Sequence, residues 1–591
     1  GQGNDYTPTN LSVSAGAGND SFPESPTLKK EFATFNSNLQ KAAGADYRQG
    51  NYSFYSNDDG TVQTRANMSR SSGKWYAEFT LTTYTSRSGS FPYIGVAPDG
   101  NFTNIWAGNN GTAYNSYGHI YRNSSQLETG HATYAQGDVI SVAINLDSSP
   151  PQVWWAKNGT YIRSGNPATG AYGINIEPAS ASGTYTFSMS LYANPGQWDA
   201  NFGQRAFAHS IPEGFKTLNT DNFSINTPSI IRPQEHFDTV IYTGDNTEYR
   251  KIPLEFKADL LWFKHRNGST SHVLSDSVSG ITKHLTPNEN NMQSSPGYPY
   301  VSSVEDNGII LRGSTNSGGN ISGRNMVAWC WKAGGAPTTT NSASVGSVPT
   351  AGSVKIDGVN ATTALAGTRY PDKMSVNTKA GFSIVKYSGT GSAFTLAHGL
   401  DRAPDVQLVK TLDGADVSWM FYTKVPDGSQ DYMFLDTTAS KGDSGFSGTT
   451  DTVFNYSAGA SSYSNTNGRN YIQYNWASIP GYSKIFMYRA NNSSDGAFFH
   501  CGFRPAFIMI KNMDNSSAPW YILDNKRNTE NECRISLQAN SAGADVTDSN
   551  FIDFLSNGFK LRTSGGYVNG NYHRLFYMAF AEQTGKTEYN L

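Results

Sequence analysis

Three matching stretches of sequence decide the fold of this chain: GRNMVAWCW at residues 323–331, GRNYIQYNW at residues 468–476 and FYMAFAE at residues 576–582. Each stretch closes a segment of about a hundred residues in which other landmarks also recur in the same order. A unit of that length is too long for a solenoid repeat and matches an independent β-sandwich. The sequence therefore predicts three related β-sandwich repeats.

The earlier landmarks of the repeats are apolar runs that are typical of β-strands. Each repeat opens with one such run, continues with a second and carries a third in its middle. The opening runs are VIYTG (240–244), IVKYSG (384–389) and IFMY (485–488); the second are ADLLWFK (258–264), APDVQLVK (403–410) and RPAFIMIK (504–511); the third are HVL (272–274), WMFY (419–422) and WYIL (520–523). Only Asn550 to Leu555, where Phe551, Phe554 and Leu555 have helical spacing, favour a helix.

Strand patterns also lie upstream of the repeats. Trp75, Ala77, Phe79 and Leu81 alternate with more polar residues, which predicts a strand with one buried face. Further along, Asn158-Gly159 separates two strand-like runs and is a strong hairpin signal, because both residues tolerate a positive φ.

These patterns divide the chain into segments, and we expect an all-β fold of tandem sandwiches. The segments are an extended N-terminal arm or connector rich in Gly, Asn, Ser and Pro (1–45), a β-sandwich (46–212), a connector (213–238), repeat 1 (239–334), a Gly-, Ser- and Thr-rich linker or insertion (335–381), repeat 2 (382–479) and repeat 3 (480–591).

The composition excludes several classes of protein. Of 591 residues, 15% are charged, 13% are aromatic, and the net charge is −3. The low content of charged residues excludes coiled coils and charge-driven disorder. Because positive and negative charges nearly balance, the sequence shows no excess of positive charge for binding nucleic acid. No apolar run reaches the ~18 residues of a membrane helix, so we expect no membrane insertion.

The cysteines predict neither a disulfide framework nor a metal site. Cys330, Cys501 and Cys533 are too few for a framework and show no CxxC spacing, so we interpret them as small apolar residues on buried strands. We expect no metal and no cofactor. The chain begins at Gly1 rather than Met, and we expect it to be part of a longer or processed protein.

Several stretches carry a family resemblance. SGKWYAEF (72–79), YIGVA (93–97), GDVISVA (137–143) and KNG (157–159) resemble the successive strands of a SPRY (B30.2-like) domain. The opening GNDYTPTNL (3–11) with DSFPESPT (20–27), the segment NFGQRAF (201–207) and the tandem repeats resemble virion proteins of tailed phages from marine and freshwater bacteria. The resemblance implies a SPRY/concanavalin-like sandwich followed by three repeats in a tail-fibre-like protein. Trp154-Trp155 and Ser149-Pro150-Pro151 depart from the SPRY pattern.

Fragments that look like catalytic motifs do not assemble into one. Gly442–Gly445 (GDSG) is similar to the nucleophile segment of trypsin-like proteases, but His398 is too near in sequence for the double-barrel fold that such a triad needs. His398 is better explained as a turn position that the repeats share, since His500 occupies the matching place in repeat 3. Gly585-Lys586-Thr587 lacks the earlier glycine of a phosphate-binding loop, because Phe580 stands there. We therefore predict no catalytic residues and no enzyme.

One stretch favours ligand binding. Aromatic residues are interleaved with Asn, Gly and Ser over residues 106–123, and such rings cover sugar surfaces while short amides bond hydroxyl groups. The alternative is that Tyr117 and Tyr121 pack within the sandwich. The candidate ligand-binding residues are Trp106, Tyr114, Tyr117, His119 and Tyr121.

Together these observations predict a bacteriophage virion protein. We expect an extracellular tail fibre or receptor-binding protein at the tail periphery that attaches to a host cell-surface receptor, a glycan, without catalysis. The alternatives are a capsid decoration or head-fibre protein on the capsid surface and, less favoured, a polysaccharide-degrading tail enzyme. The expected partners are that receptor, other virion proteins and two further copies in a homotrimer, held by side-by-side packing of the repeats, because linked weak sites gain avidity.

Overall fold

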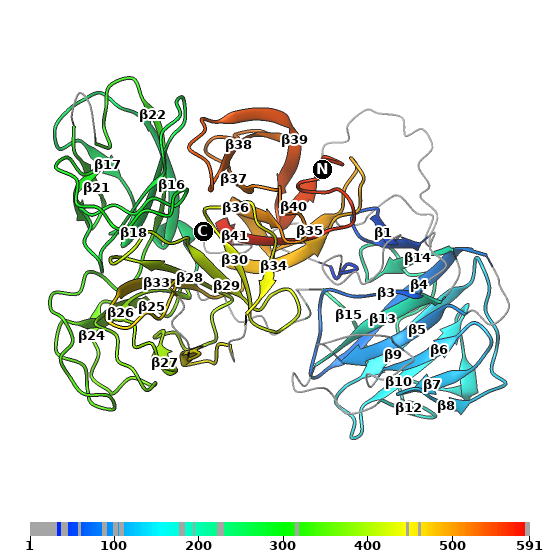
Figure 1. The fold of residues 1–591 in the computed structure, drawn as a ribbon. Coiled ribbons are helices and arrows are strands. Elements are labelled where there is room, and N and C mark those ends of the chain that lie inside the picture. Colours follow the sequence, from blue (N-terminus) through cyan, green and yellow to red (C-terminus); the bar gives the residue numbers. More distant parts are fainter. Residues whose placement is uncertain are drawn as a thin grey trace. The chain divides into compact units, whose positions relative to one another are not determined.

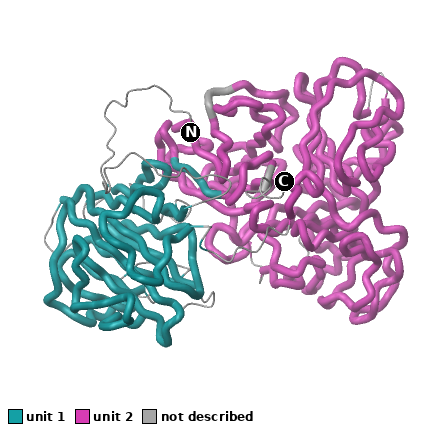
Figure 2. Tube along the Cα trace, turned by 180° about the vertical axis from the view of Figure 1, so that it is seen from behind, with its two compact units in different colours: residues 1–226, 497–500 teal, residues 227–496, 501–591 magenta. Residues whose placement is uncertain are grey.

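A computed structural model describes residues 32–36, 45–56, 61–85, 91–98, 105, 111–176, 184–192, 195–219, 222, 230–313, 318–444, 448–458 and 462–584. The chain forms two compact units, one of residues 1–226 with 497–500 and one of residues 227–496 with 501–591 (Figures 1 and 2). The predicted all-β fold is confirmed: strands dominate the described residues, and their fully described helical segments are the short 3₁₀ turns η2 (Ile162–Ser164) and η4 (Pro233–Glu235). Most of the predicted N-terminal arm lies outside the described residues.

Unit 1 is a sandwich of two sheets. The first has the strand order β1 (Ala45–Arg48), β2 (Ser53–Ser56), β14 (Gly196–Asn201), β4 (Lys74–Tyr84), β9 (Val139–Asn145), β10 (Gln152–Lys157) and β11 (Thr160–Tyr161), with β12 (Ile174–Asn175) and β15 (Lys216–Thr217) at its margins. The second has the order β3 (Thr61–Arg65), β13 (Tyr185–Tyr192), β5 (Tyr93–Pro98), β6 (Thr112–Asn115), β7 (Ile120–Arg122) and β8 (Ser125–Glu128). Residues 497–500, with β35 (Phe498–His500), belong to this unit.

The alternation predicted for β4 sorts its side chains between two clusters. Trp75, Ala77, Phe79 and Leu81 lie in the core between the sheets, whereas Tyr76 lies in a second cluster on the outer face. The double tryptophan of β10 follows the same rule, since Trp155 enters the core and Trp154 the outer cluster. Both faces of the first sheet are therefore apolar at β10, which explains why two tryptophans stand next to each other there.

Unit 2 contains the three segments predicted as repeats. Repeat 1 has one sheet of β16 (Phe237–Thr243), β22 (Asn325–Trp331), β18 (Leu260–His265) and β19 (Val273–Asp276), and a second of β17 (Lys251–Pro253), β21 (Gly308–Leu311) and β20 (Val301–Glu305). Repeat 2 has β26 (Phe382–Ser388), β33 (Asn470–Trp476), β28 (Val406–Thr411), β29 (Met420–Thr423), β30 (Asp431–Phe434) and β31 (Gly442–Asp443), with the pair β27 (Phe394–Ala397) and β32 (Val453–Tyr456). Repeat 3 has β34 (Ser483–Arg489), β41 (Arg574–Thr584), β36 (Phe503–Asn512), β37 (Trp520–Asp524), β38 (Cys533–Gln538), β39 (Val546–Leu555) and β40 (Gly558–Leu561).

Two local expectations change in unit 2. The helix favoured at Asn550 to Leu555 is wrong, because these residues form the end of β39. The segment 335–381 is partly built into repeat 2: β23 (Val354–Ile356), β24 (Val359–Asn360) and β25 (Lys373–Asn377) extend its sheet to nine strands by pairing with β26 through β25.

Four strands in each repeat are hydrogen-bonded in the same order. The orders are β16-β22-β18-β19, β26-β33-β28-β29 and β34-β41-β36-β37. In each sheet the last strand of the repeat lies in the middle and places three alternate side chains in one shared core. These side chains are Val327, Trp329 and Trp331 from β22, Ile472, Tyr474 and Trp476 from β33, and Phe576, Met578 and Phe580 from β41.

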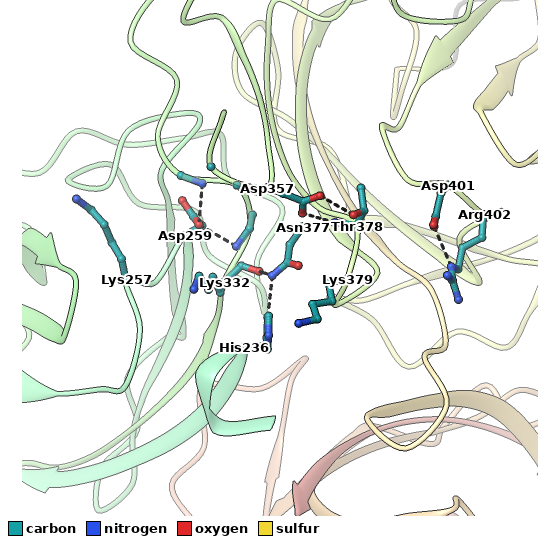
Figure 3. A pocket seen from close by; sticks show the side chains of 14 residues that line it. His236, Lys257, Asp259, Lys332, Asp357, Asn377, Thr378, Lys379, Asp401 and Arg402 are labelled. Carbon is teal, nitrogen blue, oxygen red and sulfur yellow. Dashed lines mark hydrogen bonds and ion pairs between the residues drawn. The ribbon is translucent and has the colours of Figure 1, made fainter. Parts of the chain in front are cut away.

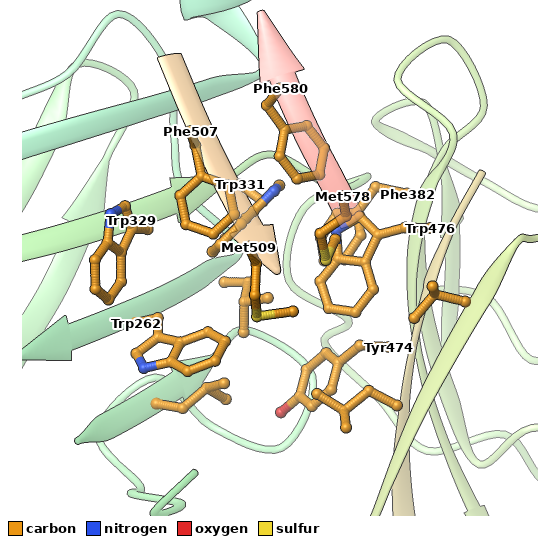
Figure 4. Close-up of a cluster of buried hydrophobic side chains, with 14 of the residues drawn as sticks. Trp262, Trp329, Trp331, Phe382, Tyr474, Trp476, Phe507, Met509, Met578 and Phe580 are labelled. Atoms are coloured by element: carbon orange, nitrogen blue, oxygen red, sulfur yellow. The ribbon is translucent and has the colours of Figure 1, made fainter. Parts of the chain in front are cut away.

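The shared core joins the repeats into one compact unit (Figure 4). The Trp331 ring lies 6.1 Å from the Trp476 ring and 5.7 Å from the Phe580 ring, so the three repeats meet at this side chain. The predicted row of separate sandwiches is thus a single unit in which each repeat buries one sheet face against the other two. The physical reason is that a face with two or three large aromatic residues cannot remain in water at low cost.

The interfaces between repeats are also cyclic. The Trp419 indole of repeat 2 donates to the Thr286 carbonyl of repeat 1 at 2.9 Å, and the Trp520 indole of repeat 3 donates to the Phe434 carbonyl of repeat 2 at 2.9 Å. His272 stands at the matching position of repeat 1, and its Nε2 lies 3.1 Å from the Gln538 carbonyl of repeat 3. The chain of contacts therefore closes on itself.

Three matched lysines accompany these contacts. Lys264, Lys410 and Lys511 are buried at equivalent positions of β18, β28 and β36, and burial lowers the pKa of each to about 8. The Lys410 ammonium donates to the Asn290 carbonyl of repeat 1 at 2.6 Å, and that of Lys511 donates to the Thr438 carbonyl of repeat 2 at 2.8 Å. Backbone carbonyls thus replace the water that these ammonium groups lose.

This packing bears on the predicted homotrimer. That prediction packs the repeats of three copies side by side, whereas the structure buries the apolar faces of the repeats against one another within one chain. A homotrimer would need a different surface.

We expect Trp331→Ala to destabilise unit 2 as a whole. Removing a fully packed indole from the shared core should cost about 3–5 kcal/mol, and the three repeats should still unfold in one transition. Denaturant unfolding followed by tryptophan fluorescence measures both. Val359→Ala is the control, because Val359 is 67% exposed and its loss should cost less than about 0.5 kcal/mol. An equally small loss in Trp331→Ala would contradict the shared core.

We expect His272→Gln to flatten the acid dependence of stability. The His272 Nδ1 accepts from the Trp262 indole at 2.8 Å, so its proton is on Nε2, and burial lowers the pKa of this imidazole from 6.5 to about 3. Between those values the unfolded chain takes up a proton that the folded chain does not, so stability is lost as pH falls. Gln keeps one acceptor and one donor but does not titrate.

The measurement for His272 is the free energy of unfolding at pH 7 and at pH 4.5. The wild type should lose more stability than His272→Gln, by an amount on the order of a few kcal/mol. The other buried groups are the same in both proteins and cancel in the difference. Parallel losses in the two proteins would show that His272 is not held neutral.

Candidate functional site

The four described residues among those predicted to bind a ligand differ in burial and do not present a common face. Trp106 lies outside the described residues. Tyr114 is completely buried in β6, where its ring packs 5.2 Å from Tyr134 and 6.0 Å from Trp155 and its hydroxyl donates to the Ala132 carbonyl. Burial raises the pKa of Tyr114. Tyr114 is therefore a core side chain and is withdrawn as a ligand contact.

The remaining candidates lie on the hairpin that follows. Tyr117 is 48% exposed, with its ring 4.3 Å from that of Phe91. His119 is half-buried, and its backbone N–H donates to the Asn115 side chain at 3.0 Å. Tyr121 is half-buried and packs edge-on at 5.7 Å against Tyr93, as the packing alternative expected. Of the four described candidates, only Tyr117 presents a largely exposed ring.

Of the fragments that look catalytic, Gly585-Lys586-Thr587 lies outside the described residues, and the other two are engaged in the fold. The His398 Nδ1 accepts from the Leu400 N–H at 3.2 Å, and its Nε2 lies 3.1 Å from the Thr450 carbonyl, so both ring nitrogens bond the backbone. The Ser444 hydroxyl donates to the Gln430 carbonyl at 2.5 Å. The His398 and Ser444 side chains each bond to the backbone of a turn, and no hydrogen bond joins the two among the described residues.

All three cysteines are buried. Cys330 lies on β22 and Cys533 on β38, as predicted, whereas Cys501 lies between β35 and β36. Within the described part of the chain, no group of three or more His, Cys, Asp or Glu side chains is arranged to hold a metal ion. The same residues contain no helix of the length and hydropathy needed to cross a membrane.

A cavity of about 770 Å³ in unit 2 has the features of a ligand site (Figure 3). It lies between repeat 1 and the start of repeat 2, and segment 335–381 supplies much of its wall. Repeats 2 and 3 are joined by only a short turn, Ala477 to Tyr482, between β33 and β34. The internal symmetry of unit 2 is therefore broken where the cavity lies. Its charged and amide lining residues are His236, Lys257, Asp259, Lys332, Asp357, Asn377, Lys379, Asp401 and Arg402.

The cavity floor is a tight backbone turn after β22. Asp259, at the start of β18, is buried, and one carboxylate oxygen accepts from the Ala333 N–H at 2.8 Å and from the Gly335 N–H at 3.2 Å. Gly334 lies between them, and a Cβ there would come within 2.5 Å of the Val376 carbonyl. Only glycine fits, so this turn approaches β25 closely. Burial raises the pKa of Asp259, and its hydrogen bonds oppose that rise.

The opposite wall is the hairpin between β23 and β24. Asp357-Gly358 forms its two-residue turn with φ of 51° and 88°, a conformation that suits this dipeptide. The Asp357 carboxylate accepts from the Thr378 N–H at 2.9 Å and from the Thr378 hydroxyl at 2.6 Å. These bonds fix the hairpin to the end of β25.

Asn377 connects the two walls. Its amide nitrogen donates to the Lys332 carbonyl at 3.1 Å and to the His236 Nδ1 at 2.9 Å (Figure 3). Burial, reinforced by Lys332 and Lys379, lowers the pKa of His236 to about 4. His236 is therefore neutral at pH 7, with its proton on Nε2.

Sequence reasoning missed this cavity. Its residues come from separate segments of unremarkable composition, and no motif joins them. The available signal was the segment 335–381, which the sequence presents as a linker or insertion between repeats 1 and 2. No segment of similar length separates repeats 2 and 3.

Comparisons with known proteins found one family model and solved structures of low similarity. No curated protein sequence matches the chain. Among solved structures, the SPRY domain of human HERC1 matches at 14% identity over 28% of this chain and 96% of that chain, with a TM-score of 0.23. A human SPRY domain matches at 16% identity over 28% and 96%, with a TM-score of 0.20.

One family model matches unit 2. It is described as a domain of unknown function, DUF7483, and it matches residues 232–368 and 355–584. The cavity and the shared core both lie within these residues. Because the matches cover more than half of the chain, this protein belongs to the DUF7483 family.

Proposed function

We propose that this protein is a non-catalytic attachment protein of a phage virion, a tail fibre or receptor-binding protein whose cavity in unit 2 binds a host-surface glycan. The observation that carries the proposal is the cavity itself. It is built where an added segment breaks the internal symmetry of unit 2, and its floor requires a glycine with no room for a side chain. Such a feature is expected of a binding site placed on a rigid scaffold.

The chemistry of the cavity suits a hydroxyl-rich ligand. Its wall combines amide, hydroxyl, ammonium and imidazole groups with a glycine-rich turn, and its volume lies within the ~300–1,000 Å³ of small-molecule sites. The resemblance of the N-terminal segments to phage virion proteins supports a place on the virion. The half-exposed Tyr117 of unit 1 offers at most an accessory contact.

We expect immunogold labelling of intact virions that carry the protein to mark the tail periphery. The two rivals give other results. Labelling of the capsid surface would identify a decoration or head-fibre protein, and the attachment role would then be abandoned. Release of reducing ends from host polysaccharide by the purified chain would establish the enzyme alternative.

We expect Lys379→Trp to abolish attachment. Lys379 is exposed at the cavity wall, so a bulky indole there should fill the cavity without disturbing the core. Binding of the fluorescently labelled full chain to host cells should fall by about tenfold or more. Lys526→Trp is the matched control, because Lys526 is an exposed lysine of the same unit that does not line the cavity. Equal binding by the two variants would remove the cavity from the attachment role.

A further inference from the structure

The acidic groups of the cavity are already satisfied. The Asp259 carboxylate accepts from two backbone N–H groups and from the Ser277 hydroxyl at 2.6 Å. Asp357 accepts twice from Thr378. Asp401 accepts from the Arg402 Nε at 3.0 Å. These carboxylates therefore have hydrogen-bond donors within the protein and need none from a ligand.

The lysine ammonium groups of the cavity have fewer partners within the protein than the carboxylates have. Among the described residues, the ammonium groups of Lys332 and Lys379 have no ion pair and no side-chain hydrogen bond. Lys257 pairs with the exposed Asp306 at 3.9 Å. Lys332 and Lys379 line the cavity with His236 and lower the pKa of that imidazole, whereas the Asp357 carboxylate raises it. Two ammonium charges against one carboxylate leave an excess of positive charge around His236, and a bound anion balances it.

His236 adds a directional donor beside these charges. Its Nδ1 accepts from Asn377, and the Asn377 oxygen accepts from the Ala380 N–H at 3.0 Å, which fixes the orientation of the amide. The imidazole therefore carries its proton on Nε2, and this N–H has no partner among the described residues. Two ammonium groups and one N–H donor together fit the several lone pairs of an oxyanion.

We propose that this cavity binds an acidic saccharide through an oxyanion, a carboxylate or a phosphate, held by Lys332, Lys379 and His236. The volume of about 770 Å³ exceeds what a lone ion fills, so a sugar ring occupies the remainder against the turn at Gly334. This inference deepens the proposed function and rests on it for the source of the saccharide.

The test is calorimetric titration of the full chain at low salt with four probes: glucuronate, glucose 6-phosphate, glucose and inorganic phosphate. At least one of the two charged sugars should bind more tightly than glucose and than phosphate, and raised salt should weaken its binding. The sugar that binds distinguishes the carboxylate from the phosphate. Equal binding of glucose would overturn the role of the anion, equal binding of phosphate would overturn the saccharide, and no binding of either charged sugar would overturn the inference.

Substitutions locate the site. Lys332→Gln and Lys379→Gln should each weaken binding of the charged sugar by about tenfold, whereas Lys526→Gln should leave it unchanged. Thermal unfolding of each variant checks that the fold is intact. Unchanged binding in both cavity variants would place the anion elsewhere and overturn the inference.

The outcomes separate this inference from the proposed function. If Lys379→Trp abolishes attachment to cells while neither charged sugar binds, the attachment role stands and the acidic ligand is rejected. If a charged sugar binds in the cavity while attachment to cells does not depend on it, the acidic ligand stands and the attachment role is rejected.

Discussion

The burial of one sheet face from each of three repeats against the other two is the constraint on which unit 2 depends. Trp331, Trp476 and Phe580 occupy equivalent positions in the middle strands, and their rings converge. Since each repeat has an apolar sheet face, a repeat alone would expose that face to water, and the three are stable only together. Burial of apolar area does not by itself fix how two repeats are oriented. The hydrogen bonds from the Trp419 and Trp520 indoles to carbonyls of the preceding repeat fix that orientation.

The shared core of unit 2 is built from equivalent strands of the three repeats, and the candidate binding cavity lies where an added segment breaks this equivalence. Repeat 2 is preceded by a segment that adds β23, β24 and β25 to its sheet, and the cavity opens between that addition and repeat 1. The rigid part and the variable part are thus separated: the shared core sets the spacing of the walls, and a few residues at turns supply the chemistry. Gly334 admits no side chain and the Asp259 carboxylate accepts from the N–H groups on either side of it, so sterics and hydrogen bonds together fix the position of the floor.

Much of the fold follows from the sequence because strands with a period of two record which face is buried. Residues 550–555 were misleading for the opposite reason: Phe551, Ile552 and Phe554 are all buried, and a strand covered on both faces loses its alternation. Tyr114 was misleading because its polar neighbours Asn115 and Ser116 are themselves buried, so the mixed pattern belongs to the core. The cavity was not predictable, since Lys332 meets Asp357 and Lys379 only through the packing of repeat 1 against the start of repeat 2.

Closure of the contacts between repeat 3 and repeat 1 has a consequence for how such a domain can evolve. The Thr270 N–H donates to the Ala542 carbonyl at 3.0 Å and Arg266 pairs with Asp545 at 2.8 Å, so the last repeat is bound to the first. Open solenoids gain or lose copies at their ends, where capping repeats cover the exposed face. A closed ring has no end: a deletion would expose two apolar faces, and an extra copy would have none to join. Selection can therefore lengthen the turns between strands, as at 335–381, while the number of copies stays fixed at three.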